Sequence, residues 1–203
     1  MTTEQSEIGF ELAGSGVVTI DWGDGSEKIT LTLTEGVNNT FRRVYLNASI
    51  RTITVSGDSI TKLNCEFRHL TSLDVSKNTA LTKLYCSDNQ LTSLDVSKNT
   101  ALTDLGCSRN QLTSLDVSKN TALTGLGCKG NQLTSLDVSK NTALTALYCS
   151  RNQLTGDALD FLFMTLPYAI NEGIIYVYVQ GNPGTTICNP SIAMAKGWEV
   201  IRY

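Results

Sequence analysis

The 203-residue chain contains a single histidine, His69, and no P-loop of the form GxxxxGK[ST]. A Ser-His-Asp catalytic set needs a histidine, and one histidine cannot serve a site that is built around a repeat. The P-loop is the usual signature of a nucleotide-phosphate site. These absences argue against an enzyme, and they give no reason to expect a cofactor.

Neither sign of charge is in large excess, because 16 Lys and Arg residues face 19 Asp and Glu residues and the net charge is −3. A nucleic-acid partner is therefore not expected, since such proteins gather a basic excess on one surface. No apolar run reaches the 18 residues of a membrane-spanning helix, so direct membrane insertion of this chain is not expected. The first seven residues are polar and contain no apolar signal segment. Export would need a signal outside this sequence, and a cytoplasmic location is the alternative.

One unit of 21 residues dominates what is present. The pattern LTSLDVSKNTALTxLxCxxNQ occurs four times without a gap, starting at Leu70, Leu91, Leu112 and Leu133. A unit this short cannot bury its own apolar face, so it must stack on its neighbours. The sequence therefore predicts a mainly β solenoid of about five coils over residues 50–155.

Each unit contains two shorter patterns, LxxLxCxxN and LxxLxVxxN. Alternation in Leu84-x-Cys86 and Leu94-x-Val96 has the period of a strand, which predicts two short parallel sheets on either side of a flattened core. The asparagine that ends each pattern lies where the chain must turn, and its amide can bond backbone groups left unpaired there. We therefore predict two stacked asparagine columns, namely Asn89, Asn110, Asn131 and Asn152, and Asn78, Asn99, Asn120 and Asn141.

Five of the six cysteines share one position of the repeat: Cys65, Cys86, Cys107, Cys128 and Cys149. Free cysteine behaves as a small buried hydrophobe, so this spacing predicts a column of inward-pointing thiols. Zinc is the alternative, but it needs closely spaced pairs of ligands, for which Cys65 with His69 is the nearest candidate. We predict no metal site.

The two patterns resemble a bacterial leucine-rich repeat of the short 21-residue kind. The resemblance covers about half of the chain, and residues 50–69 extend it by one degenerate coil in which Arg68 replaces the turn asparagine. The apolar positions of that coil are Ile50, Ile53, Val55, Ile60, Leu63 and Cys65. The resemblance implies that ligands bind to the strand side of the repeats.

Residues 1–49 are predicted to form a β-cap. Val18, Ile20 and Trp22 alternate with polar residues, and Gly23-Asp24-Gly25 favours a turn before a second alternating run at 29–33. The segment resembles, in reduced form, the Trp-Gly-Asp-Gly signature of PKD-like β-sandwich modules. We expect Asp21 and Asp24 to satisfy their own turn, because calcium needs more oxygen ligands than this spacing supplies.

Residues 156–203 are predicted to form an α/β cap. A helix is expected between Thr155 and Pro167, because apolar residues follow there at helical spacing. A strand at 174–179, a turn at 181–184, a short helix at 191–196 and a strand at 198–201 should follow. Cap, repeats and C-terminal segment together resemble surface leucine-rich-repeat proteins of gut Bacteroidetes. That resemblance implies export to an extracellular or outer-membrane location.

The four copies differ only at positions around the cysteine, whereas other exposed positions, such as that of Lys98, are identical in every copy. Three of the four variable positions are expected to point outward on the strand side. One of them reads Tyr85, Gly106, Gly127 and Tyr148 along the stack, which predicts a shallow notch with aromatic walls about 14 Å apart. Its charged surroundings are Lys83, Asp104, Arg109, Lys129 and Arg151.

We interpret this variable strand side as the ligand-binding surface, and neutral drift is the alternative interpretation. Asp74, Asp95, Asp116 and Asp137 form an acidic column that is expected to be a regular surface feature. Carboxylates in equivalent surroundings have similar pKa values, whereas a catalytic acid and base need different ones. The sequence thus predicts a non-enzymatic scaffold for adhesion or recognition, whose ligand is a protein or a glycan. A structural spacer without a specific ligand is the alternative.

Overall fold

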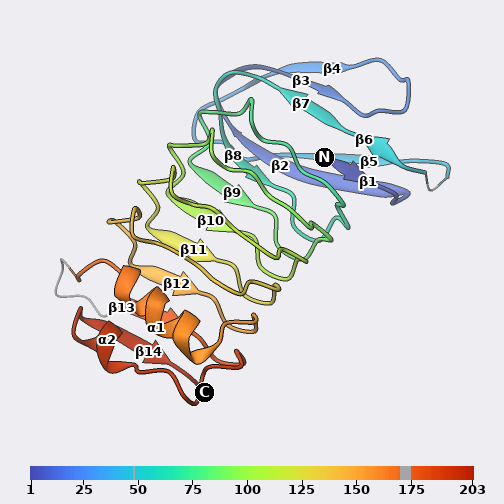
Figure 1. Ribbon diagram of the computed structural model, residues 1–203. Coiled ribbons are helices and arrows are strands. Elements are labelled where there is room, and N and C mark those ends of the chain that lie inside the picture. The colour runs from blue at the N-terminus through green and yellow to red at the C-terminus, as the bar shows by residue number, and fades with distance from the viewer. Residues whose placement is uncertain (48, 170–174) are drawn as a thin grey trace.

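The computed structural model describes residues 1–47, 49–169 and 175–203. A nine-stranded sheet runs through both ends of the elongated molecule, with the strand order β14-β13-β12-β11-β10-β9-β8-β2-β5 (Figure 1). Seven neighbouring strands of this sheet are parallel: β8 (Ile60–Asn64), β9 (Lys83–Tyr85), β10 (Asp104–Gly106), β11 (Gly125–Gly127), β12 (Ala146–Tyr148), β13 (Ile175–Tyr178) and β14 (Trp198–Ile201). The predicted solenoid is confirmed, with about six turns.

The repeat length sets the register of the sheet. Leu84 pairs with Leu105, and Leu105 pairs with Leu126, so equivalent residues of successive copies lie side by side. These leucines are buried, as are the cysteines two positions further on, which are inaccessible to solvent in all five coils. Burial raises the pKa of Cys65, Cys107 and Cys149 to about 12, so the thiols stay protonated and unreactive. The predicted thiol column is confirmed.

The prediction of a second parallel sheet is wrong for the part of the chain that is described. On the side opposite the strands, each coil turns instead, although Val96 and its equivalents are buried as expected. Asp95 Oδ1 accepts the backbone N–H of Ser97 at 2.8 Å, and Val96 O accepts the N–H of Asn99 at 3.0 Å. These bonds within one coil occupy groups that a strand ladder would need. The acidic column therefore caps turns, and the hydrogen bonds from Ser97 lower the pKa of Asp95.

Both asparagine columns are present. In the first column, Asn110 Oδ1 accepts the N–H of Leu91 at 3.0 Å, and Nδ2 donates to the carbonyls of Cys86 and Cys107, each at 3.0 Å. In the second, the Nδ2 of Asn120 donates to carbonyl oxygens of the preceding coil. Apart from Asn78, which begins the second column, each of these side chains ties its coil to the preceding one.

The first asparagine column continues into the C-terminal cap. Asn182 Nδ2 donates to Cys149 O at 3.1 Å and to Val179 O at 2.7 Å, as the repeat asparagines do. Val177-x-Val179-x-x-Asn182 has the spacing of Leu147-x-Cys149-x-x-Asn152, a signal that the prediction of an ordinary cap overlooked. The cap therefore begins as one more turn of the solenoid.

The C-terminal helices lie beside the last turns. The helix α1 (Gly156–Thr165) begins at Thr155, whose Oγ1 accepts the N–H of Ala158, and Thr165 Oγ1 accepts the N–H of Val138 on the turn side of the solenoid. The helix α2 (Ser191–Met194) is shorter than predicted. Residue 174, where the predicted strand starts, lies outside the described residues. No helix in the described ranges is long and apolar enough to span a membrane.

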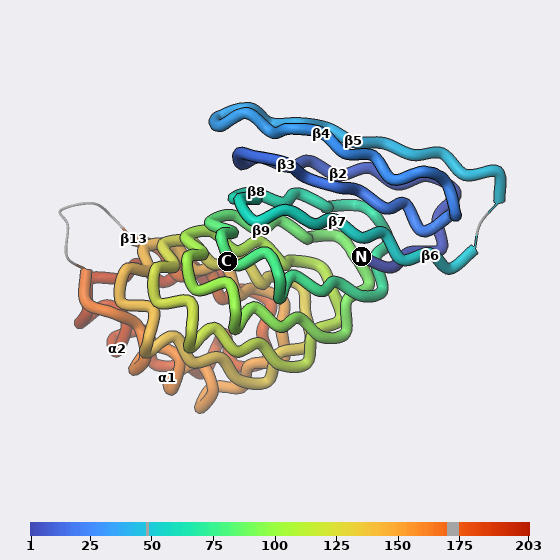
Figure 2. Tube along the Cα trace, turned by 90° about the horizontal axis from the view of Figure 1, so that it is seen from above, coloured from blue at the N-terminus to red at the C-terminus, as the bar shows by residue number. Residues whose placement is uncertain are grey.

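The N-terminal cap is built from β strands, as predicted, and lies over the first turns (Figure 2). The strand β2 (Glu7–Gly14) joins β8 antiparallel, and β5 (Asn39–Val44) joins β2. A smaller sheet contains β3 (Gly16–Asp21), β4 (Ile29–Leu33) and β7 (Thr54–Ser56), while β1 (Thr2–Thr3) pairs with β6 (Arg51–Thr52). The cap thus covers the open end of the repeat core.

The start of the degenerate coil differs from the prediction. Ile50 does not fill an apolar position, because it is 71% exposed, and residues 51–56 pair with strands of the cap. Arg68, which replaces the turn asparagine, donates from Nε to Gly9 O on β2. The position thus links cap and solenoid.

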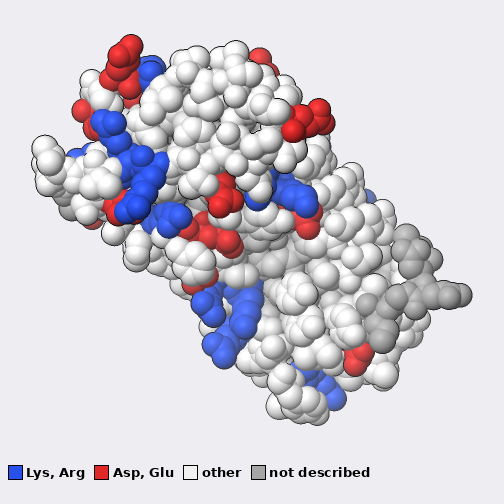
Figure 3. All heavy atoms as spheres, turned by 180° about the vertical axis from the view of Figure 1, so that it is seen from behind, with Lys and Arg blue, Asp and Glu red and all other residues white. Residues whose placement is uncertain are grey.

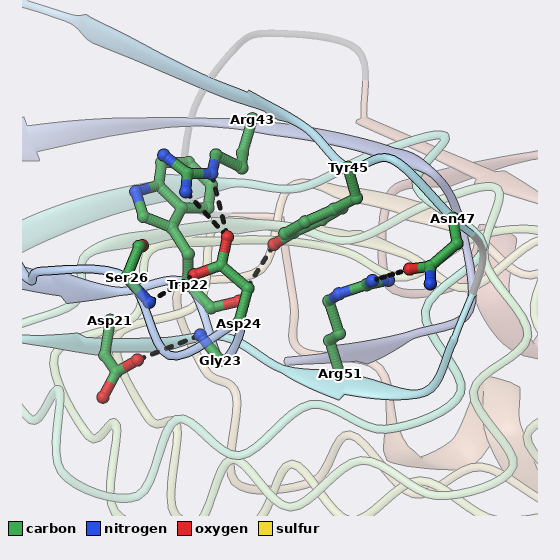
Figure 4. Close-up of polar contacts among 9 residues, drawn as sticks. All are labelled: Asp21, Trp22, Gly23, Asp24, Ser26, Arg43, Tyr45, Asn47 and Arg51. Atoms are coloured by element: carbon green, nitrogen blue, oxygen red, sulfur yellow. Dashed lines mark hydrogen bonds and ion pairs between the residues drawn. The ribbon is translucent and has the colours of Figure 1, made fainter.

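The Asp21–Ser26 turn is satisfied by its own backbone, as expected (Figure 4). Asp21 Oδ1 accepts the N–H of Gly23 at 2.9 Å, and Asp24 Oδ1 accepts the N–H of Ser26 at 3.0 Å. Asp24 also pairs with Arg43 at 2.8 Å. The hydrogen bonds from Ser26, together with Arg43, lower the pKa of Asp24 to about 2.

This shift predicts a pH-dependent contribution of Asp24 to stability. A carboxylate with a depressed folded-state pKa stabilises the fold above its unfolded pKa, near 3.8, and loses that contribution as the pH falls through about 2. We expect Asp24→Asn to melt at a lower temperature than the wild type at pH 7, and most of this difference to be lost at pH 2. Thermal unfolding at pH 7, 4 and 2 measures this. Glu35→Gln, at an exposed position of the same cap, is the control, and an equal deficit for Asp24→Asn at pH 7 and pH 2 would refute the charge argument.

Candidate ligand-binding surface

Four variable residues lie in one row across the outer face of the sheet. Gly106 pairs with Tyr85 on one side and with Gly127 on the other, and Gly127 pairs with Tyr148. Their sequence neighbours Leu105 and others point into the core, so this row points outward. The predicted order Tyr-Gly-Gly-Tyr is therefore the true spatial order, and we call it the tyrosine–glycine row.

The two tyrosines that should form the walls of the predicted notch lie differently. Tyr85 leans over its glycine neighbour, because a Cβ added to Gly106 would lie 3.1 Å from Tyr85 Cδ1. Tyr148 stacks instead on Tyr178 of β13, with ring centroids 4.7 Å apart and an interplanar angle of 14°. The bare part of the floor is thus reduced to β11, where both Gly125 and Gly127 point outward.

Two further tyrosines belong to this surface, although the sequence pattern did not predict it. Tyr178 pairs with Tyr148 across the sheet, and Tyr176 lies with its ring centroid 6.0 Å from that of Tyr178. They were assigned to the cap, yet β13 continues the parallel sheet. The outer face of the sheet therefore has an aromatic cluster of Tyr148, Tyr176 and Tyr178 beside the glycines of β11.

The charged residues near the row are partly paired. Lys83 lies 3.9 Å from Asp104, and Arg109 lies 3.2 Å from Asp88. Burial, with a contribution from Asp104, raises the pKa of Tyr85, so this ring is neutral at physiological pH. Within the described residues, no ion pair includes Lys129 or Arg151. On the face that Figure 3 shows, acidic and basic side chains are interspersed and no patch of one sign dominates.

The last variable position of each coil is constrained by the backbone. Arg109 and Arg151 adopt the left-handed region, with φ of 51° and 54°, and Gly130 and Gly181 do so at the same position of their coils. This conformation favours glycine and is uncommon for other residues. Selection for a ligand is therefore only one of the constraints on this position.

The segment Gly125-Leu-Gly-Cys-Lys-Gly130 fits the spacing GxGxxG of dinucleotide-binding loops. That motif works by directing a helix N-terminus at a pyrophosphate, after a tight turn that follows a strand. Here Gly125 and Gly127 lie within β11, and a turn and the next coil follow instead of a helix. The match is a consequence of the repeat and supports no nucleotide site.

The family comparisons agree with the fold. A model for leucine-rich repeats in two copies matches residues 79–120, and a model for a single leucine-rich repeat matches residues 68–83. Fold, repeat pattern and these matches define a leucine-rich-repeat solenoid. No curated protein matches the chain significantly.

Among solved structures, the chain is similar to internalins. The functional domain of InlJ from Listeria monocytogenes, which is described as including a cysteine ladder, is 34% identical, with 66% of this chain and 37% of that chain covered and a TM-score of 0.43. The internalin InlF from Listeria monocytogenes is 21% identical, with 64% of this chain and 36% of that chain covered and a TM-score of 0.53. The chain spans little more than a third of the length of each.

Proposed function

We propose that the protein is a non-enzymatic scaffold that binds a protein partner through the outer face of its parallel sheet. The observation that supports this most is the difference in sequence variation between the two sides of the repeats. Copies differ on this face, around the tyrosine–glycine row, while exposed residues of the turn side, such as Lys98, are the same in all copies. Drift would affect both sides equally.

The exposed tyrosines support the same surface. Tyr148 is 45% exposed although its strand is paired on both sides within the sheet. Tyrosine combines a large apolar ring with a polar tip and is enriched among residues that dominate binding energy at interfaces. Backbone pairing fixes the strand of Tyr148, and stacking on Tyr178 holds its ring, so little conformational entropy is lost when a partner binds.

We also propose that the protein acts outside the cell or at its surface, as its resemblance to exported leucine-rich-repeat proteins implies. The state of the cysteines is compatible with this location. All six are buried and none is paired, so an oxidising environment meets no accessible thiol.

The proposal is tested by screening the protein against a panel of extracellular proteins and a glycan array, followed by titration of the ligands found. Tyr85→Ala and Tyr148→Ala should each weaken binding by at least about 1 kcal/mol, and Gly127→Trp should block it. Phe161→Ala on α1 removes a similarly exposed ring from another surface and should leave the affinity unchanged, as should Asp95→Ala on the turn side.

Two results would contradict the proposal. If Asp95→Ala loses affinity while both tyrosine variants keep it, the turn side is the binding surface. If neither panel yields a ligand, the spacer alternative is favoured. If a glycan binds and its affinity depends on the tyrosines, the proposed binding surface stands and the class of ligand changes.

A further inference from the structure

The aromatic stack on the outer face of the sheet ends at Tyr148. One face of this ring packs on Tyr178, 4.7 Å away, which belongs to the next strand toward the C-terminus. The other face looks toward β11, where the paired residue is Gly127 and has no side chain. The atoms nearest to a Cβ added at Gly127 would belong to Ser108, Leu105 and Gly106, and not to Tyr148. The ring of Tyr148 therefore does not lean over Gly127 as the ring of Tyr85 leans over Gly106.

The vacant space above β11 has room for one further ring. Neighbouring strands are about 4.8 Å apart, which is nearly the distance between the two stacked rings. A planar ring above Gly127 would therefore continue the stack with the same spacing. One strand further on, Tyr85 already covers Gly106, so a second ring is excluded.

The floor of this space is bare over two outward positions. Gly125 and Gly127 flank the buried Leu126, and a Cβ at either would meet nothing closer than 3.5 Å. Asp104 lies at one end, with Oδ1 3.5 Å from that Cβ position on Gly125. Lys129 follows Gly127 by two residues and is half-buried at the other end. Charges of opposite sign thus border the two ends of the floor.

We propose that the gap above Gly125 and Gly127 receives a single aromatic side chain of a protein partner, which stacks on the free face of Tyr148. An acidic residue next to that side chain would pair with Lys129. This inference rests on the proposed function and specifies the chemistry of the partner. A protein partner is favoured because the gap continues a stack of flat rings and is bordered by charges, which suit a side chain within a charged peptide segment.

The experiment uses a random peptide library displayed on phage and selected on the immobilised wild-type protein. We expect the selected peptides to share one Tyr, Trp or Phe, and its replacement by Ala in a synthetic peptide to weaken binding at least about tenfold. Tyr148→Ala should cause a similar loss. Gly127→Tyr should abolish binding while its melting temperature stays at or above that of the wild type, because the new ring takes the place of the ligand ring.

Phe161→Ala is the control, because it removes an exposed aromatic ring from α1, outside the strand face. It should change peptide affinity by less than about threefold. A Gly127→Tyr variant that unfolds would be replaced in the comparison by Gly125→Tyr, whose ring would cover the same floor.

The outcomes separate this inference from the proposed function. Aromatic peptides could bind the wild type and Gly127→Tyr with equal affinity and fail to bind Tyr85→Ala. That result would overturn the proposed ring site above Gly127 and leave the strand face as the binding surface. Peptides without a shared aromatic residue, or a glycan blocked by Gly127→Tyr, would overturn the proposed partner chemistry alone. Binding that is insensitive to all of these substitutions would overturn both.

Discussion

Replacing Asn110 by alanine should lower the free energy of unfolding by about 3–5 kcal/mol, one of the largest effects expected of a single substitution here. The side chain is buried and serves four backbone groups: the N–H of Leu91 and the carbonyls of Cys86, Cys107 and Ser108. Each buried backbone group that loses its partner costs about 1–3 kcal/mol. The sum is reduced because each of the three carbonyls keeps another donor: Asn89 Nδ2 for Cys86, Asn131 Nδ2 for Cys107 and the backbone N–H of Asp88 for Ser108.

Urea unfolding of Asn110→Ala and of a matched variant, Asn78→Ala, measures this effect. Asn78 is the first asparagine of the other column, is only half-buried, and forms its hydrogen bonds through its backbone N–H and carbonyl. Its replacement should cost less than about 1 kcal/mol, and that of the exposed Lys98 should cost less than about 0.5 kcal/mol. Similar midpoints for Asn110→Ala and Asn78→Ala would show that side-chain bonding between coils does not hold the solenoid together.

Gly184→Ala should destabilise the C-terminal cap by about 2–4 kcal/mol, because the added methyl group has no space. Its Cβ would lie 2.2 Å from Thr155 C and 2.3 Å from Gly156 N, which are backbone atoms at the start of α1. The Gly184 N–H also donates to Leu154 O at 2.9 Å, so the loop cannot move away without losing that bond. The backbone of Gly184 has an ordinary φ, so the cost is steric.

Gly127→Ala provides the comparison, because it adds the same methyl group where the nearest atom is 3.5 Å away. In a strand, this exchange should be neutral or stabilising by up to about 1 kcal/mol, since alanine loses less conformational freedom on folding. Thermal unfolding of both variants decides the point. A wild-type melting temperature for Gly184→Ala would mean that the cap and α1 are packed less closely than described.

The fold was predictable from the sequence because the repeat is regular. Copies of equal length place equivalent residues side by side, so the inward leucines and cysteines and the position of Asn110 followed from spacing alone. The order of Tyr85, Gly106, Gly127 and Tyr148 across the sheet followed for the same reason. The caps were predictable as β and α/β structure from alternation and helical spacing, without their contacts to the repeats.

The tertiary structure decided what depends on contacts between segments or on competition for hydrogen bonds. The pattern around Val96 predicts a strand, but Asp95 and Asn99 form hydrogen bonds within their own coil that make the chain turn. Only one parallel sheet therefore forms along the repeats. The ring of Tyr148 stacks on Tyr178 because β13 joins the sheet across 30 residues of sequence. Repetition by itself determined which residues are neighbours along the stack. Which way each ring leans, and which space remains open beside it, depends on side chains that packing brings together from distant parts of the chain.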